Sequence, residues 1–278
     1  MKMNKIKLFA SCLLLGILPF HEQGKAQQTS AAAPPDENAF QNGEELTYKI
    51  YYNLNFIWMP AGEVTFKVFD EGSQFHYQAY GETYSSYEWF FSVKDNYDSW
   101  VDKTTLLPNY SERSVNEGNY HIFEKISFNQ SAKKTTVWRA DKRGETETKT
   151  EHSVKKQVHD VLSILYQLRN TDFGSQKVGY TLPFSIFMDK EEFPLQLQYL
   201  GKTARKKVRG MGRFKTLKFQ PAVIAGNVFK EDSRMSVWVS DDRNRIPVLI
   251  ESPVSVGSVK MVLKKYEGLK YPFEGNAD

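Results

Sequence analysis

The stretch EELTYKIYYNL, residues 44–54, decides the fold class. Its large apolar side chains recur at every second position, at Leu46, Tyr48, Ile50, Tyr52 and Leu54. Successive side chains of a β-strand point to opposite faces of a sheet, so a period of two predicts a strand with one apolar face.

The same alternation continues along the chain. Strands at 64–68 and 75–79 follow, with turns expected at Pro60–Gly62 and at 71–73, where proline and glycine favour a change of direction. Further strands are predicted at 97–101, 109–115, 120–128, 134–139, 176–188, 193–199, 214–223, 235–239, 246–252 and 257–266. Strands this close in sequence are most simply joined as antiparallel hairpins.

One segment, residues 159–170, has a helical period instead. Its apolar stripe consists of Val161, Leu162, Ile164, Leu165 and Leu168. This spacing of three and four predicts an amphipathic helix of about three turns. Asp160 and Arg169 lie where their charges suit the two ends of the helix dipole. A shorter helical piece is expected near 85–91, and the charged stretch 141–156 is expected to be an exposed loop.

These patterns predict a mainly β protein. We expect an antiparallel curved sheet, half-open barrel or sandwich of about a dozen strands with one packed α-helix, and favour the half-open barrel. Residues 41–272 form this single antiparallel β domain in our prediction, with the helix near 159–170. A division into two domains near residue 160 is the alternative.

The first residues have the pattern of a secretory signal peptide. A basic start precedes the apolar run 8–20, and Gly24-Lys25-Ala26 places small residues where signal peptidase cleaves. We predict removal of residues 1–26 and export to the periplasm or outer cell envelope. Residues 27–40 are mostly polar or small and are predicted to form a disordered tether. Its first residues, Gln27-Gln28, resemble the start of exported Bacteroidota proteins.

Cys12 raises the alternative of lipidation. The apolar run continues beyond Cys12, so cleavage there would divide the signal peptide, and simple secretion is favoured. Cys12 is also the single cysteine, so the processed chain can form no disulfide and depends on its core.

The basic character of the chain belongs largely to its start. Processing leaves 37 − 4 = 33 basic and 33 − 1 = 32 acidic residues, a formal net charge of +1. A nearly neutral chain is a poor partner for nucleic acid, which we exclude. No later apolar run is long enough for a transmembrane segment. Oligomeric state is not indicated.

Several motifs occur in a fixed order along the chain. They are GEELTY at 43–48, PAGE at 60–63, DVLSILYQLR at 160–169, WVSDD at 238–242, RIPV at 245–248 and GS at 257–258. With this ordered set, the chain resembles the bacterial family named domain of unknown function 3108. The resemblance implies an exported, β-rich protein and supplies no catalytic residues.

Motifs for catalysis, metals or cofactors are missing. The processed chain keeps four histidines, and His152 and His159 have no carboxylate at ligand spacing, so neither metal nor cofactor is predicted. There is no G-x-S-x-G sequence for a nucleophilic serine and no glycine-rich phosphate loop. His159-Asp160 is explained by a helix start.

Aromatic residues make up 14% of the chain and cluster in its first half. Core packing is their usual role. However, adjacent strand residues point to opposite faces, so a dense cluster also indicates an apolar groove. The candidate groove residues are Trp58, Tyr84, Tyr87, Trp89 and Phe90.

A second candidate surface is basic and lies within residues 202–218. Its central residues are Arg205, Lys206, Lys207 and Arg209. Such a patch suits lipid head groups or an acidic partner. The simpler explanation is a solvated hairpin whose charges discourage edge pairing.

The sequence patterns leave three alternative functions. The first is a non-enzymatic envelope protein that binds an apolar or amphiphilic, lipid-like ligand in the concave sheet. The second is a protein-interaction or assembly module of the envelope. The third, which is the least supported, is a hydrolase of envelope polymers that uses carboxylates such as Glu63 or Asp95.

Overall fold

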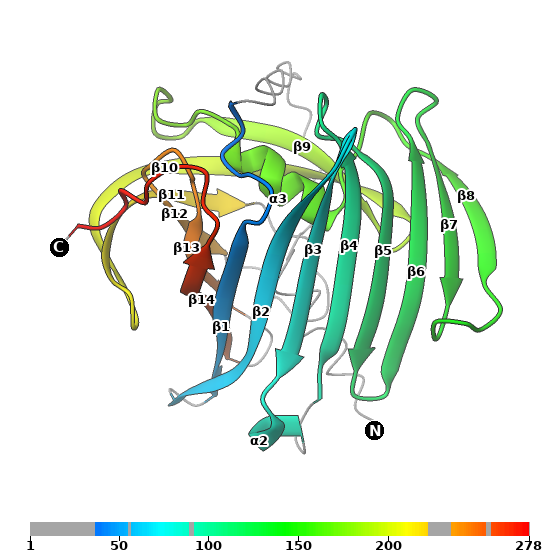
Figure 1. The fold of residues 1–278 in the computed structure, drawn as a ribbon, viewed down its shortest axis with the longest axis horizontal. Helices are drawn as coiled ribbons and strands as arrows, with labels where there is room; N and C mark the ends of the chain where they lie inside the picture. Colours follow the sequence, from blue (N-terminus) through cyan, green and yellow to red (C-terminus); the bar gives the residue numbers. More distant parts are fainter. Residues whose placement is uncertain (1–36, 55–56, 89–91, 222–234, 254–256, 278) are drawn as a thin grey trace.

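The computed structural model describes residues 37–54, 57–88, 92–221, 235–253 and 257–277. Within these ranges, fourteen strands form one continuous sheet (Figure 1), and neighbouring strands run antiparallel. The strands are β1 (Glu45–Leu54), β2 (Ile57–Glu71), β3 (Gln74–Thr83), β4 (Lys94–Asp102), β5 (Pro108–Glu117), β6 (Tyr120–Asn129), β7 (Lys134–Ala140), β8 (Thr148–Ser153), β9 (Thr181–Met188), β10 (Glu191–Val208), β11 (Gly212–Pro221), β12 (Ser236–Ser240), β13 (Pro247–Pro253) and β14 (Ser258–Glu267).

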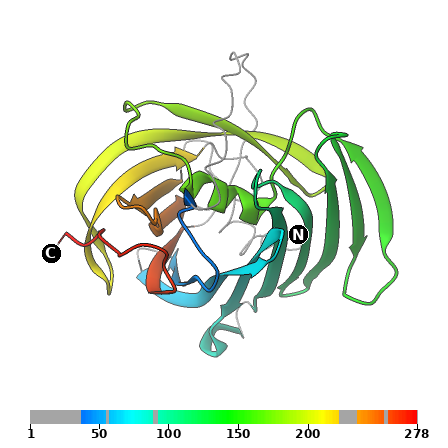
Figure 2. The same cartoon turned by 45° about the horizontal axis from the view of Figure 1, so that its top comes forward.

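The strand order brings both halves of the sequence into one sheet. It runs β8-β7-β6-β5-β4-β3-β2-β1-β14-β13-β12-β11-β10-β9, so β1 and β14 pair at the centre while β8 and β9 form the edges. The sheet is strongly curved (Figure 2) but not closed. The expected mainly β fold, an open curved sheet with a packed helix, is confirmed.

The curvature brings the β9–β10 hairpin over the inner face of β5–β7. Asp189, in the hairpin turn, contacts Arg113 of β5 and Arg139 of β7. Phe187 of β9 also lies in one apolar cluster with Phe128 of β6. The inside of the curl is therefore bounded by two parts of the same sheet.

Helix α3 (Val161–Arg169) lies inside this curl (Figure 2) and packs against β3, β4 and β9. It begins at the N-cap Asp160, whose carboxylate accepts hydrogen bonds from the backbone N–H groups of Leu162 and Ser163. The Ser163 hydroxyl accepts from the Asp160 N–H, which completes a capping box. The Ser99 hydroxyl of β4 donates to the same carboxylate and fixes the helix start to the sheet.

The predicted helix is confirmed within its expected range. Its two charged residues, Asp160 and Arg169, fix opposite ends of the helix. Asp160 is bound at the start, whereas Arg169 is bound at the end by Glu44. Between them, Tyr166 stacks on Tyr77 of β3 with ring centroids 4.0 Å apart. The short helix α2 spans Ser85–Glu88, and residues 89–91 of its expected range lie outside the described residues.

The turn expected at Pro60–Gly62 is wrong, because these residues lie within β2. The ladder between β1 and β2 contains a bulge where Ile50 pairs with Gly62 and Tyr51 with Pro60. A Cβ atom on Gly62 would lie 2.2 Å from the carbonyl oxygen of Glu82 in β3. The glycine is thus required by close approach of the next strand, and proline is tolerated at a bulge.

The stretch 141–156, expected to be an exposed loop, contains strand β8. This strand has little apolar alternation and forms an edge of the sheet. Edge strands are commonly rich in charged and polar residues, which hides them from a search for apolar period. Several predicted strands also differ in extent, and β2 and β10 are much longer than the predicted 64–68 and 193–199. Strand β9 begins at Thr181 instead of 176, and residues 222–223 of the predicted strand 214–223 lie outside the described residues.

The boundaries of the domain are wider than predicted. Phe40, assigned to the disordered tether, is buried against Phe75, Tyr77 and Tyr166. Beyond residue 272, the backbone N–H of Ala277 donates to the carbonyl of Arg213. Phe40 thus completes the core before residue 41, and the backbone after residue 272 extends the hydrogen bonding of the domain.

Candidate functional site: an apolar cavity beside helix α3

An apolar cavity of about 130 Å³ lies between helix α3 and the second half of the sheet. One buried cluster centres on β1–β4, β13 and β14, and a second on β9–β11. Residues of both clusters line the cavity, which lies where the two cores do not meet. Its apolar walls include Leu46, Phe66, Leu165, Leu168, Phe184, Leu197, Leu217, Phe219, Val239 and Met261.

Helix α3 supplies one wall. All four side chains at Ile164, Leu165, Tyr166 and Leu168 line the cavity, and among them Leu165 and Leu168 are partly accessible whereas Ile164 and Tyr166 are buried. These two leucines belong to the apolar stripe that predicted the helix. The stripe therefore exceeds what is needed to hold the helix on the sheet.

Two arginines lie among the lining residues, and their environments differ. Arg169 is buried and forms a bidentate pair with Glu44, with nitrogen–oxygen distances of 2.5 and 2.8 Å. Burial opposes its charge, but Glu44 outweighs this effect and raises the pKa of Arg169 above its ordinary value. This cation is fully engaged in holding the end of α3.

Arg245 has no comparable counter-ion among the described residues. Its Nη1 donates to the carbonyl of Arg169 at 3.0 Å. Its other terminal nitrogen lies 4.0 Å from an oxygen of Asp172, whose side chain is 65% exposed. The Arg245 side chain is 25% exposed and lines the cavity, so a partly accessible cationic group lies in a largely apolar wall.

The inner face of β5–β7 is filled by side chains of two kinds, the apolar cluster that contains Phe128 and Phe187 and, beside it, a set of ion pairs. Arg113 Nη2 lies 2.9 Å from Glu124 and 2.5 Å from Asp189. Arg139 contacts the same two carboxylates. Although burial alone would raise the pKa of Asp189, the two guanidinium groups hold it below its ordinary value. These charges neutralise one another and form a closed network.

A carboxyl pair lies nearby on β4 and β5. Asp95 is 1% exposed, and its Oδ1 accepts from the Asn116 N–H. Burial, followed by the neighbouring Glu117 carboxyl, raises the pKa of Asp95 to about 7. The adjoining cavity measures about 40 Å³, enough for a few water molecules but not a sugar ring. Glu63, the other acid considered for hydrolysis, instead accepts hydrogen bonds from Tyr84 and Lys264.

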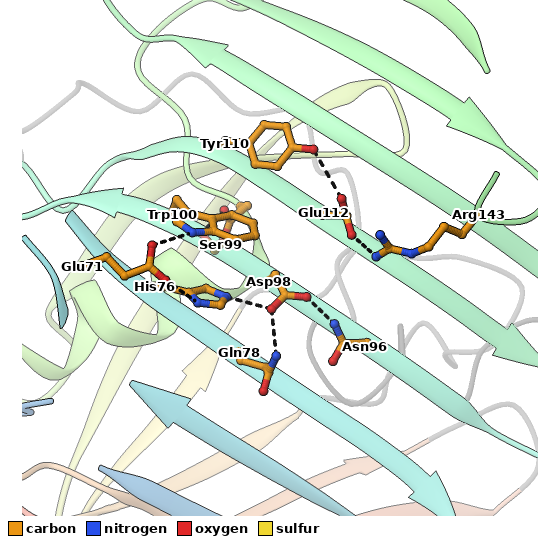
Figure 3. Close-up of polar contacts among 11 residues, drawn as sticks. Glu71, His76, Gln78, Asn96, Asp98, Ser99, Trp100, Tyr110, Glu112 and Arg143 are labelled. Carbon is orange, nitrogen blue, oxygen red and sulfur yellow. Dashed lines mark hydrogen bonds and ion pairs between the residues drawn. The ribbon is translucent and has the colours of Figure 1, made fainter. Parts of the chain in front are cut away.

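The opposite face of β3 and β4 carries a polar network (Figure 3). His76 lies between two carboxylates, with Nδ1 3.1 Å from Glu71 and Nε2 2.8 Å from Asp98. Its ring stacks on Trp100 with centroids 4.4 Å apart, and Gln78 donates to Asp98 at 3.0 Å. These groups satisfy one another across neighbouring strands, which favours a structural role.

The predicted groove residues do not line the cavity where the structure describes their side chains. The Trp58 ring lies 4.1 Å from Lys260 Nζ, and the Tyr84 hydroxyl donates to Glu63 at 2.5 Å. Both contact charged groups elsewhere on the sheet. The Tyr87 side chain, together with Trp89 and Phe90, lies outside the described residues.

The four basic candidates gather on β10 and its turn into β11. Arg205, Lys207 and Arg209 are exposed. Lys206 Nζ lies 3.4 Å from the ring centroid of Trp238, and burial lowers its pKa. None of the four lines the cavity. The hairpin expected from the sequence is formed by β10 and β11, and its Lys206 covers the Trp238 ring.

Sequence reasoning missed Arg245 as a site residue. The residue stands in the matched motif RIPV, but that motif gave no chemical reason to select it. Arg245 has a φ of +48°, a conformation rare for residues other than glycine. No pattern of residue types reveals such a backbone conformation.

Two further features are absent from the described residues. Among the described helices, there is no apolar segment of the length that a bilayer span requires. No group of three or more metal-binding side chains occurs in these ranges either.

Comparison with known proteins places the chain in a family without an assigned activity. No curated protein matches. A solved structure, the beta-barrel-like protein of domain of unknown function DUF1849 from Brucella abortus, aligns with a TM-score of 0.54 at 10% identity. The alignment covers 83% of this chain and 99% of that protein, a likeness of fold alone. A family model described as protein of unknown function (DUF3108) matches residues 47–264. The chain therefore belongs to the DUF3108 family.

Proposed function

We propose that this protein is a non-enzymatic, exported envelope protein that binds an apolar or amphiphilic molecule in its concave sheet. The observation that carries this proposal is the cavity of about 130 Å³ between α3 and the sheet, whose walls are almost entirely apolar. A cavity lined in this way stays dry and accepts apolar guests.

An apolar cavity reduces stability unless a ligand fills it. At about 24 cal/mol per Å³, a cavity of 130 Å³ corresponds to about 3 kcal/mol. A domain is stable by only about 5–15 kcal/mol in total. One larger wall residue could close much of this space. Cavity-filling changes of this kind are a common route to stabilisation. Occupation of the cavity by a ligand would offset this cost.

The helix wall supports the same function. Leu165 and Leu168 are partly accessible although they face the interior. A bound acyl chain would cover them, and each methylene group removed from water contributes about 0.8 kcal/mol. The surrounding sheet provides a rigid frame for this contact.

Export and envelope location form part of the proposal on the strength of the first 26 residues. Their basic start, apolar run and small residues before position 27 match a secretory signal. The intact mass of the protein purified from its native host tests this point. Cleavage after Ala26 supports export, and retention of Cys12 with acyl chains would replace it by lipidation.

The binding function is tested by titration with N-phenyl-1-naphthylamine, a neutral fluorescent probe whose phenyl ring has the size of the benzene molecule that a cavity of this volume accepts. We expect saturable binding to the purified protein and loss of binding in Val239→Phe, which fills the cavity from β12. The matched control is Val178→Phe, at a side chain that is 71% exposed. It should bind as the unaltered protein does. Failure of the unaltered protein to bind the probe contradicts the proposal.

The alternative function, an assembly module, makes a different prediction. Isolation from native envelopes would then yield a stoichiometric protein partner and no extractable lipid. The cavity favours the ligand-binding function, since an interaction surface requires no hollow interior.

A further inference from the structure

We infer that the ligand is an anionic, single-chain amphiphile whose oxyanion head pairs with Arg245 while its chain enters the cavity. This inference rests on the proposed ligand-binding function and specifies the class of ligand. The shared chemistry is a carboxylate or a phosphate monoester on one acyl or alkyl chain.

The charge at the cavity selects the head group. Arg169 and Arg245 are the two cationic side chains that line it. Arg169 is neutralised by both oxygens of Glu44, and its remaining donors bind backbone carbonyls of Ala39 and Asn244. Arg245 keeps donors that face no close carboxylate among the described residues, since the oxygen of Asp172 is 4.0 Å away. An oxyanion at this position would receive charge-assisted hydrogen bonds, which are about twice as strong as neutral ones.

The backbone holds Arg245 in place before a ligand arrives. Its φ of +48° is unfavourable for a residue with a side chain. The conformation is held by Asp242, whose Oδ1 accepts from the N–H groups of Asn244 and Arg245, each at 3.1 Å. Asn244 is fully buried and exchanges hydrogen bonds with the backbone of Tyr271 at 3.0 Å. The backbone therefore presents the Arg245 side chain to the cavity wall in a fixed conformation.

One guanidinium bond aims the side chain. Arg245 Nη1 donates to the carbonyl of Arg169, the last residue of α3. This bond fixes the plane of the guanidinium group beside the helix that forms the cavity wall. A planar group with several fixed donors matches the geometry of carboxylate and phosphate oxygens.

The cavity limits the apolar part of the ligand. A volume of about 130 Å³ is close to that of a cavity that accepts one benzene molecule, about 150 Å³. This space admits part of a single chain and is too small for the two chains of a phospholipid. The ligand class is therefore a fatty acid or an alkyl phosphate.

The inference is tested by displacement of N-phenyl-1-naphthylamine with three ligands of equal chain length. Dodecanoate, dodecyl phosphate and 1-dodecanol share the chain and differ in the head group. At pH 8 and below their micellar concentrations, we expect at least one of the two anions to bind at least tenfold more tightly than the alcohol. The two anion arms separate a carboxylate source from a phosphate source.

Variants assign the preference to Arg245. Arg245→Gln should bring the anions within about threefold of the alcohol while probe binding, and hence the folded cavity, is retained. The matched control is Arg243→Gln, two positions away, whose guanidinium lies 3.8 Å from the Tyr271 ring and not in the cavity wall. This control should keep the preference for anions.

The outcomes separate the two proposals. If the probe and all three ligands fail to bind, both the ligand-binding function and the inference are wrong. If the alcohol binds as tightly as both anions, or if Arg245→Gln keeps the full preference, the cavity is a ligand site but the anionic class is wrong. A preference that disappears in Arg245→Gln alone supports the inference.

Discussion

Two regions of the inner face of this curved sheet differ in packing, since ion pairs and an apolar cluster fill one of them and a cavity is left in the other. Under β5–β7, Arg113, Arg139, Glu124 and Asp189 form a closed network of ion pairs. Beside α3 and β9–β14, apolar side chains leave a cavity of about 130 Å³. Both regions use the same strand alternation, so the alternation alone does not decide where a ligand can bind. What matters is whether the facing elements complete the packing.

The difference has a structural cause. The β9–β10 turn places Asp189 directly on the two arginines and closes the charged side. On the apolar side, the short helix α3 presents Leu165 and Leu168, which stay partly accessible. We therefore assign stability to the charged network and binding to the apolar cavity, and this division predicts distinct effects of mutation.

The largest effect is expected in the ion-pair network. Glu124→Gln removes a carboxylate that contacts both Arg113 and Arg139. The Glu124 side chain is 1% exposed, so water cannot replace these contacts. Removing one partner from a buried ion pair costs about 3–5 kcal/mol, and Asp189 remains as the second partner of both arginines. Urea unfolding should show a loss of this size, with probe binding unchanged where the protein is folded.

A surface ion pair provides the control for this prediction. The side chains of Lys149 and Glu151 are 57% and 64% exposed. Glu151→Gln should change the free energy of unfolding by less than about 1 kcal/mol. Equal effects of the two substitutions would show that the network does not close the inner face.

An intermediate effect is expected from Asp95 as the pH changes. The folded pKa of about 7 exceeds the ordinary value of 3.8, so the folded state holds the proton more tightly. The resulting stabilisation is complete below about pH 4 and disappears as the pH rises through 7. Its slope is at most about 1.4 kcal/mol per pH unit. Unfolding measured from pH 4 to pH 8 should show this decline.

The substitution Asp95→Asn isolates this contribution. The neutral amide should reduce the decline, because no second negative charge then forms beside Glu117. The exposed Asp141→Asn should leave the profile unchanged. An unaltered profile in Asp95→Asn would show that the carboxyl pair does not hold a proton across this range.

The smallest effect is expected from filling the cavity. Val239→Phe should raise the free energy of unfolding by about 0.5–2 kcal/mol, since cavity-filling substitutions commonly stabilise. It should also abolish probe binding. A loss of about 1–3 kcal/mol instead would indicate overpacking and a site that is already filled.

The sequence was informative where a local pattern decides the structure. Strict alternation predicted the sheet, and Asp160 with the apolar stripe predicted α3 and its start. The bulge at Pro60–Gly62 was misread, because the same residues that favour turns also permit close approach of strands. Strand β8 was missed since an edge strand needs no apolar face.

The candidate site was less predictable. Trp58 and Tyr84 are large aromatics, but their contacts with charged groups appear only in three dimensions. The cavity depends on how α3 is spaced from strands far away in sequence. Arg245 depends on a backbone conformation held by Asp242 and Asn244. Neither property can be read from residue types.

The most direct measurement is a crystal structure of the protein grown with 12-bromododecanoic acid. We expect an anomalous bromine peak between α3 and β10–β13 and the carboxylate beside Arg245. A cavity occupied by the protein's own side chains, with no bromine peak inside the curl, would contradict ligand binding at this site.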